Sequence, residues 1–342
     1  MTRTKPTDFA YMLSRYLSIY LPGQRNYSSH TILSYRDTFK LLLAYLKNEK
    51  HLPPEQVTLD IFDRSVVIDF ICWLKHTRGN SASTCNQRLG AVHAFFEFLQ
   101  GEMPEKMPIC QEVMAVKMMK APDSTINYLS IDGVRAILAM PDTHTKSGRR
   151  DATMLCLLYD TGARVQELID LTVGDVRFVS PATVRLNGKG SKARIVPLLH
   201  GTEELLQAYM NNLPSKPFQD NNLPLFYNYD RQKFTRSGIT YIFKKYADKA
   251  RAIHPGLIPK ILSPHCFRHS KAMHLLQADV NLVYIRDLLG HTSIKTTEIY
   301  ARADSTAKRQ ALEKASSAIG TVQFPNWQTD SGLMDWLQNF GK

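Results

Sequence analysis

The sequence predicts a mainly α-helical protein with a small antiparallel β-sheet, divided into two domains. Its 342 residues exceed the length of most single domains. Apolar residues recur at helical spacing through residues 1–120. Residues 182–198 instead carry two β-branched runs around a Gly-Lys-Gly turn, which is typical of a hairpin. We expect a helical domain over residues 1–120, a linker over 121–125, a mixed α/β domain over 126–320 and a tail over 321–342.

The first domain is expected to hold five helices, placed by their apolar period and their capping residues. They cover residues 8–20, about 29–49 behind Ser28 or Ser29, a segment from Asp63 past Leu74, a segment from Ser81 or Ser83 to Gly101, and the vicinity of 110–119. A loop with Pro22 and Gly23 separates the first two helices. Pro122 breaks the helical pattern and marks the linker.

The second domain is expected to be helical around its hairpin. Ser130 can cap a helix over Val134–Leu138, and an apolar helix over Asp151–Thr161 ends at Gly162. The hairpin follows, and helices resume after Pro264.

Composition favours an intracellular protein with a polyanionic partner. The net charge is +12, and both domains are basic. Five scattered cysteines without a CxxC pair indicate reduced thiols. The N-terminus lacks the apolar stretch of a signal peptide, and no apolar run approaches the roughly 20 residues that span a bilayer. We therefore expect a cytoplasmic protein with no membrane partner.

Two local patterns around the hairpin suggest chemistry. Arg164 opens a helix, where the helix dipole disfavours a cation, and Glu167 follows one turn later. The pair is either an exposed ion pair or part of a functional site. Lys189 lies at the hairpin tip, where it can reach into a groove or remain solvated.

Two further patterns lie near the end of the second domain. His265 and Arg268 share a helix face behind Pro264. A zinc site at His265 and His269 is the alternative, although no third ligand is evident. His291 follows a helix-ending glycine, and Tyr300 comes nine residues later. Taken singly, each of these two residues could be structural.

The four patterns together resemble the tyrosine recombinase (phage integrase) family. They read TGAR, GKGSK, HCFRH and LGHTSIKTTEIY, in the family's order and spacing. The resemblance covers about residues 8 to 305. It implies a two-domain DNA breaking-rejoining enzyme fold, with a SAM-like core-binding domain followed by a catalytic domain.

The resemblance also implies a role for each motif residue. Tyr300 is the nucleophile that forms a 3′-phosphotyrosyl link and releases a 5′-hydroxyl. Arg164 and Arg268 would bind the non-bridging oxygens of the scissile phosphate, and His291 would donate a hydrogen bond to that phosphate. His265 would accept the proton of Tyr300, and Lys189 would donate a proton to the leaving oxygen. Glu167 would orient the site. No metal, ATP or other cofactor is expected, because the arginines supply the positive charge and the phosphotyrosyl bond keeps the phosphodiester energy.

Double-stranded DNA is the expected partner. The predicted DNA-binding residues are polar or basic side chains on helices and beside the hairpin: Thr84, Asn86, Gln87, Arg88, Lys192, Lys244 and Lys245. A solvated polar face is the alternative for each of them.

Other functions that share this chemistry or fold remain open. A type IB topoisomerase uses the same chemistry, and a DNA-binding regulator could keep the fold without activity. The resemblance implies a tetramer on paired sites, which could serve a mobile element, as an integrase or transposase, or Xer-like chromosome resolution. Residues 329–342 carry an apolar stripe capped by Asp330 or Ser331, which could dock on a neighbouring protomer or on its own domain.

Overall fold

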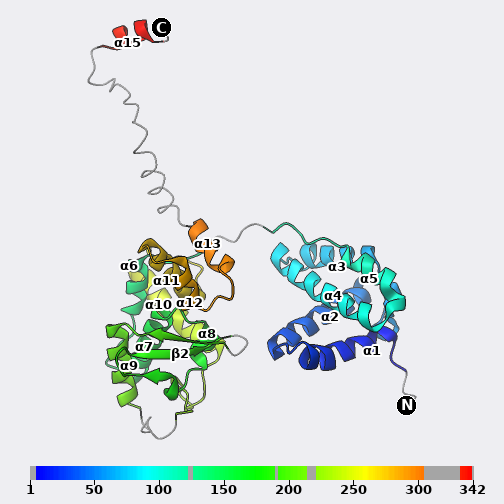
Figure 1. Cartoon of the computed structure of the whole chain (residues 1–342), viewed down its shortest axis with the longest axis horizontal. Helices are drawn as coiled ribbons and strands as arrows, with labels where there is room; N and C mark the ends of the chain where they lie inside the picture. The colour runs from blue at the N-terminus through cyan, green and yellow to red at the C-terminus, as the bar shows by residue number, and fades with distance from the viewer. Residues whose placement is uncertain (1–4, 122–125, 189–191, 214–220, 304–331, 341–342) are drawn as a thin grey trace. The chain divides into compact units, whose positions relative to one another are not determined.

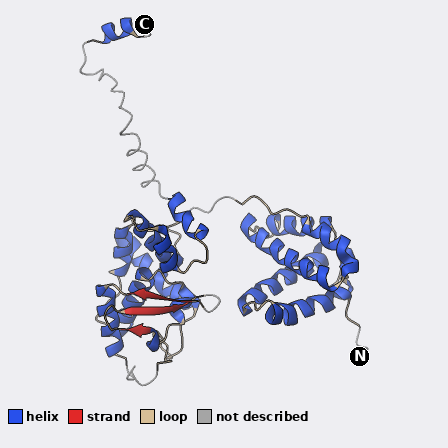
Figure 2. Ribbon diagram, viewed as in Figure 1, coloured by secondary structure: helices blue, strands red, loops and turns tan. Residues whose placement is uncertain are grey.

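The computed structural model describes residues 5–121, 126–188, 192–213, 221–303 and 332–340. The chain divides into two compact units, Met1–Ser124 and Thr125–Lys342. It is mostly helical, and the described strands all belong to the second unit (Figure 2). No helix in the described ranges is both long and apolar enough to cross a membrane.

The first unit is a bundle of helices (Figure 1), and its core is rich in aromatic side chains. Its elements are α1 Asp8–Arg15, η1 Tyr16–Gln24, α2 Ser29–Glu49, η2 Pro54–Gln56, η3 Leu59–Ile61, α3 Arg64–His76, α4 Ala82–Glu102, η4 Pro104–Lys106 and α5 Met107–Met114. The side chains of Ser28, Asp63 and Ser81 cap α2, α3 and α4 by accepting backbone N–H bonds, as predicted. The buried rings of Phe9, Phe39 and Phe95 meet at the centre of the bundle.

The predicted loop at Pro22 and Gly23 is wrong. The helix continues there as the wider π-helical segment η1, and the Arg25 N–H donates to the carbonyl of Tyr20 across five residues. The wider turn accommodates a proline that lacks an N–H, while buried Leu21 keeps the segment on the core. Gly101 also falls inside α4, one residue before its end.

The second unit contains, within its described residues, a three-stranded antiparallel sheet of order β1-β2-β3. Its elements are α6 Ile131–Leu138, α7 Lys146–Asp160, α8 Val165–Ile169, η5 Val173–Asp175, β1 Val176–Arg177, β2 Thr183–Asn187, β3 Ala193–Pro197, α9 His200–Asn211, α10 Arg236–Ile253, α11 His265–Gln277, α12 Leu282–Leu289, α13 Lys295–Ala303 and α15 Leu333–Asn339. The predicted hairpin is confirmed as β2 and β3, with Val184 opposite Val196.

Two expectations for the second unit are wrong, and strand β1 was not predicted. Helices resume before Pro264, because α9 and α10 precede it. The apolar residues that are buried on α10 recur at helical spacing, so the sequence carries the pattern of an amphipathic helix there. Helix α7 begins at Lys146 instead of Asp151, because its first turn is polar and lacks the apolar residues from which the helix start was predicted. Strand β1 has only two residues, too few to show an alternating pattern.

Candidate active site

The turn between α7 and α8 presents Arg164. Helix α7 ends at Asp160, and Gly162 has a φ of 57°, a left-handed value that favours glycine. Arg164 is the N-cap residue of α8. Glu167 offsets the unfavourable position of this cation: its Oε2 accepts the Arg164 N–H at 2.8 Å and its Oε1 accepts from Nη1 at 2.7 Å. The predicted pairing of Arg164 with Glu167 is therefore present.

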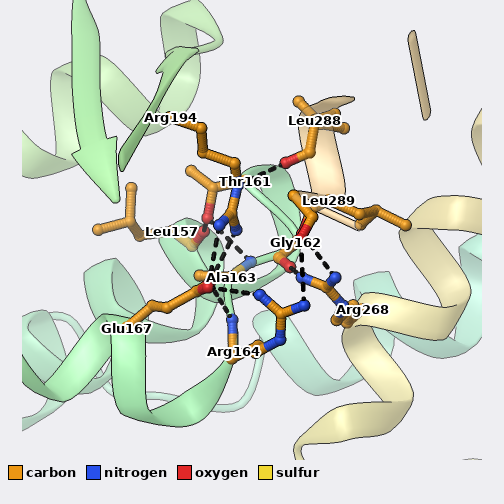
Figure 3. Close-up of polar contacts among 11 residues, drawn as sticks. Leu157, Thr161, Gly162, Ala163, Arg164, Glu167, Arg194, Arg268, Leu288 and Leu289 are labelled. Carbon is orange, nitrogen blue, oxygen red and sulfur yellow. Dashed lines mark hydrogen bonds and ion pairs between the residues drawn. The ribbon is translucent and has the colours of Figure 1, made fainter. Parts of the chain in front are cut away.

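Glu167 is buried and is shared by two arginines (Figure 3). Arg194 on β3 donates from Nη1 and Nη2 to the two carboxylate oxygens at 2.9 and 2.7 Å. Burial alone would raise the pKa of Glu167, but the hydrogen bonds from Arg194 and Arg164 outweigh it and lower the pKa to about 2. The carboxylate is therefore ionised at neutral pH and joins α8 to the hairpin.

Arg268 on α11 is almost completely buried, with 2% exposure. Its Nη1 donates to the Gly162 carbonyl at 2.7 Å and its Nη2 to the Leu289 carbonyl at 2.6 Å (Figure 3). Burial, followed by repulsion from Arg164 and Arg194, lowers the pKa of Arg268 to about 9. The guanidinium remains charged at neutral pH and connects three segments that are remote in sequence.

Two histidines lie on α11 beside Arg268. His265 is the first residue of the helix and is exposed, and its ring centroid lies 4.6 Å from that of His269. Partial desolvation and the nearby Arg268 lower the pKa of His265. Desolvation and His265 lower the pKa of His269 to about 4. Both imidazoles are thus neutral at pH 7 and able to accept a proton.

Tyr300 lies on α13 and is buried, with 1% exposure. It packs in a cluster with Met273, Ile285 and Leu289. Its hydroxyl lies 3.0 Å from Nδ1 of His269. Desolvation raises the pKa of Tyr300, so the phenol is protonated in this conformation. The structure thus places His269 next to the phenol, whereas the sequence assigned the proton-accepting role to His265.

His291 follows the left-handed turn at Gly290, whose φ is 62°. A Cβ on Gly290 would lie 2.9 Å from Nη1 of Arg194, so the turn requires glycine for space as well as for backbone conformation. His291 Nδ1 lies 2.9 Å from the Thr297 hydroxyl. Desolvation, followed by Arg268 and Arg164, lowers the pKa of His291 to about 4.

A cavity of about 410 Å³ opens beside these residues. Its lining includes the basic side chains of Arg164, Lys192, Arg194 and Arg286, together with His291. Asp287 is the acidic member of the lining, and it pairs with Arg286 at 2.7 Å. The excess of positive charge suits a bound anion such as a phosphate.

A metal centre has little support in the described parts of the chain, where no group of three or more His, Cys, Asp or Glu residues could hold a metal ion. Lys189 lies outside the described residues. Its neighbour Lys192 is exposed at the start of the hairpin's second strand.

Two of the predicted DNA contacts on α4 form hydrogen bonds within their own unit. Asn86 exchanges two hydrogen bonds with the backbone of Met119, at 2.7 and 2.8 Å. Arg88 donates to the Ser34 carbonyl and the Thr38 hydroxyl, both at 3.0 Å. These hydrogen bonds join α4 to α2 and to the segment after α5, and contact of Asn86 and Arg88 with DNA stays a prediction.

The remaining predicted contacts are more accessible. Gln87 is exposed, while Thr84 is half-buried and exchanges a hydrogen bond with the Ser81 hydroxyl. Lys244 and Lys245 are exposed on α10, and the Lys245 ammonium lies 4.9 Å from the centroid of the Tyr246 ring. Contact with DNA stays a prediction for these residues.

Arg194 and His269 lie outside the predicted set of site residues. The sequence holds a signal for each of them. Arg194 shares a strand face with buried Val196, so alternation places a charged side chain on the inner face of the hairpin. His269 follows His265 by four residues and therefore shares its helix face.

The family model of the phage integrase family matches residues 127–307, and that of the phage integrase N-terminal SAM-like domain matches residues 13–102. The chain belongs to the phage integrase family and is a site-specific DNA recombinase of the tyrosine recombinase type. It is 33% identical over 336 residues to the putative integrase/recombinase y4rC of Sinorhizobium fredii, covering 98% of this chain and 99% of that protein. It is 32% identical over 302 residues to the tyrosine recombinase XerD of Staphylococcus epidermidis, covering 87% of this chain and 96% of that protein.

Solved structures share the fold. The XerH recombinase bound to palindromic difH substrate has a TM-score of 0.64 at 21% identity and covers 86% of this chain and 81% of its own. The Tn1549 transposon integrase in complex with transposon right end DNA has a TM-score of 0.68 at 18% identity, and the match covers 89% of this chain and 99% of that one. The predicted fold class is thereby confirmed.

Proposed function

We propose that this recombinase cuts and rejoins double-stranded DNA at specific sites through a covalent bond between Tyr300 and a DNA 3′-phosphate. The Tyr300 oxygen forms a bond to phosphorus as the bond to the 5′-oxygen breaks. The phenolic proton passes to a histidine of α11, and Lys189 supplies a proton to the leaving 5′-oxygen. Rejoining reverses these steps with a different 5′-hydroxyl.

The observation that carries this proposal is the convergence of Arg164, Arg268 and His291 beside a cationic cavity. Burial is the main cause of the lowered pKa of Arg268, and repulsion from Arg164 adds to it, so the two guanidinium groups lie close together. A phosphate in the cavity would offset this repulsion. Since the transition state gains negative charge, fixed guanidinium groups stabilise it more than the ground state.

This charge arrangement makes a metal ion and ATP unnecessary for the proposed reaction. The planar fork of arginine forms two parallel bonds to non-bridging oxygens. The phosphotyrosyl bond keeps the energy of the phosphodiester for rejoining. Glu167 acts indirectly by holding the backbone and guanidinium of Arg164.

The buried phenol gives His269 a role beside His265. Because its pKa is low, His269 is neutral and can accept a hydrogen bond from Tyr300. Tyr300 is 1% exposed and must reach the scissile phosphate to react, so we infer that α13 shifts when DNA binds. The exposed His265 can then accept the proton at the phosphate.

We also propose that the enzyme acts as a tetramer on two paired sites, within the cytoplasm, and belongs to a mobile element. The integrase/recombinase y4rC matches nearly the full chain, whereas the XerD match covers 87%. A structural neighbour is a transposon integrase in complex with transposon DNA. An Xer-like role in chromosome resolution is the alternative.

A nicked suicide substrate tests the nucleophile. Such a substrate loses a short fragment after cleavage and traps the covalent adduct. Tyr300→Phe should give no adduct and still bind DNA, because only the nucleophilic oxygen is removed. Tyr284→Phe is the matched control, since Tyr284 is 71% exposed on α12, and it should form the adduct normally. An adduct in Tyr300→Phe would refute the assignment.

A further inference from the structure

Arg194 is a largely buried cation at the edge of the cavity, and the proposed chemistry assigns it no step. Its side chain is 11% exposed and lies at the start of β3, on the same strand face as Val196. Burying a guanidinium costs several kcal/mol unless its donors are paired. Arg194 meets this requirement with Glu167 on α8 and the Leu288 carbonyl on α12.

The contacts of Arg194 use the full planar fork. Nη1 and Nη2 donate to the two Glu167 oxygens, and Nε donates to the Leu288 carbonyl at 2.7 Å. Lysine, with a single nitrogen, cannot occupy these three positions. The absence of a side chain on Gly290 leaves the space that the guanidinium requires.

These contacts are linked directly to two residues of the candidate active site. Each Glu167 oxygen that accepts from Arg194 also accepts from Arg164, one from the backbone N–H and one from Nη1. The Leu288 carbonyl lies three residues before His291. Without Arg194, the Glu167 carboxylate would lose two of its four hydrogen bonds, and the end of α12 would lose the hydrogen bond from Arg194 to the Leu288 carbonyl.

We propose that Arg194 is a positioning residue for recombination, which acts through Glu167 and the Leu288 carbonyl to hold Arg164 and His291 at the phosphate cavity. The inference rests on the proposed function, in which Arg164 neutralises the scissile phosphate. Arg194 thereby makes the orientation of Arg164 depend on the hairpin.

An uncharged scissile linkage separates this role from a general structural one. In a methylphosphonate, a methyl group replaces one non-bridging oxygen and removes the charge that Arg164 must neutralise. Arg194→Gln should slow single-turnover cleavage of ordinary DNA at saturating enzyme by about 10- to 100-fold. On the methylphosphonate substrate, the loss of cleavage rate caused by Arg194→Gln should be at least fivefold smaller than on ordinary DNA. A purely structural defect would slow both substrates alike.

Two control variants define the range of the assay. Arg164→Ala should show the same preference for the uncharged linkage. Arg185→Gln is the matched control from the same hairpin: Arg185 is 58% exposed and pairs with the buried Asp175 at 2.9 Å, and its variant should cleave both substrates at the wild-type rates.

A double variant tests the route of action. If Arg194 acts through Glu167, the rate losses of Arg194→Gln and Glu167→Gln should not add in the double variant. Arg194→Lys, which keeps the charge but not the fork, should resemble Arg194→Gln and replaces it if glutamine prevents folding. Thermal unfolding and single-site DNA binding identify folded variants.

The outcomes distinguish this inference from the proposed function. If Arg164→Ala slows both substrates equally, the arginine clamp itself is wrong. If Arg164→Ala prefers the uncharged linkage but Arg194→Gln and Arg194→Lys slow both substrates equally or not at all, the positioning role of Arg194 is overturned. Additive losses in the double variant would exclude Glu167 as its route.

Discussion

Replacing Arg268 with lysine should damage folding and catalysis by different amounts. The guanidinium donates to two backbone carbonyls, those of Gly162 and Leu289, at 2.7 and 2.6 Å. A single ammonium nitrogen cannot occupy both Nη positions, so one buried carbonyl loses its charged donor. A hydrogen bond to a charged group contributes about 1.5 to 3 kcal/mol, so the free energy of unfolding should fall by about 2 kcal/mol. Cleavage should slow by about 100-fold, because the bidentate clamp is lost.

Urea denaturation gives the free energy of unfolding, and trapping with a suicide substrate gives the cleavage rate under conditions where the variant is folded. Arg150→Lys is the matched control. Arg150 is also partly buried, with bonds to Asp151 and the Tyr227 carbonyl, and has no assigned catalytic role. It should lose stability without losing the cleavage rate. If Arg268→Lys cleaves within threefold of the wild-type rate, the clamp assignment is refuted, whatever happens to stability.

Three further predictions concern the metal, pH and the C-terminal segment. Cleavage should proceed at an unchanged rate in saturating EDTA, and a loss that added zinc reverses would restore the metal alternative at His265 and His269. The pKa values of His269 and His291 are lowered to about 4 in the folded state. The unfolded chain therefore binds more protons than the folded chain below about pH 6.5. The urea midpoint should consequently decrease as the pH is lowered from 7.5 to 5.5. His200→Asn, which alters an exposed histidine, should keep this decrease, and a midpoint independent of pH would contradict the inference. Deleting residues 329–342 should leave single-site DNA binding intact. It should reduce cooperative occupancy of paired sites and the rate of recombination at least tenfold. Unchanged pairing of sites would exclude docking of the tail on a neighbouring protomer.

The deletion is motivated by the short helix α15. Leu337 and Phe340 on or beside this helix are 52% and 70% exposed, and the rings of Trp336 and Phe340 lie 4.5 Å apart. The helix begins after Gly332, while the predicted caps Asp330 and Ser331 lie outside the described residues. A seven-residue helix is unstable by itself in water, which supports a docked state in the assembled enzyme.

Local sequence patterns were sufficient to predict much of the fold. Ser28, Asp63, Ser81 and Ser130 mark helix starts because their side chains accept bonds from backbone N–H groups in the next turn. The hairpin was predictable because β-branched residues flank a glycine-rich turn. Both effects act over a few residues, so they can be recognised without a tertiary structure.

The long-range pairing of side chains was beyond such patterns. Arg194 and Glu167 are 27 residues apart, and their ion pair forms because α8 packs against the hairpin at β2, the strand paired with β3. Asn86 exchanges two hydrogen bonds with the backbone of Met119, 33 residues away, which no local pattern predicts. Local periodicity identifies the buried face of an element but not the segment that covers it.

The same distinction applies to the proposed nucleophile and its proposed proton acceptor. The sequence by itself predicts Tyr300 as the nucleophile and places His265, Arg268 and His269 close together on one helix, because helical spacing brings residues three and four apart to one face. The packing of α13 on α11 and α12 determines that the phenol is buried and lies beside His269. This choice depends on three helices meeting in space, since the hydrogen bond spans 31 residues and no local rule orients the ring.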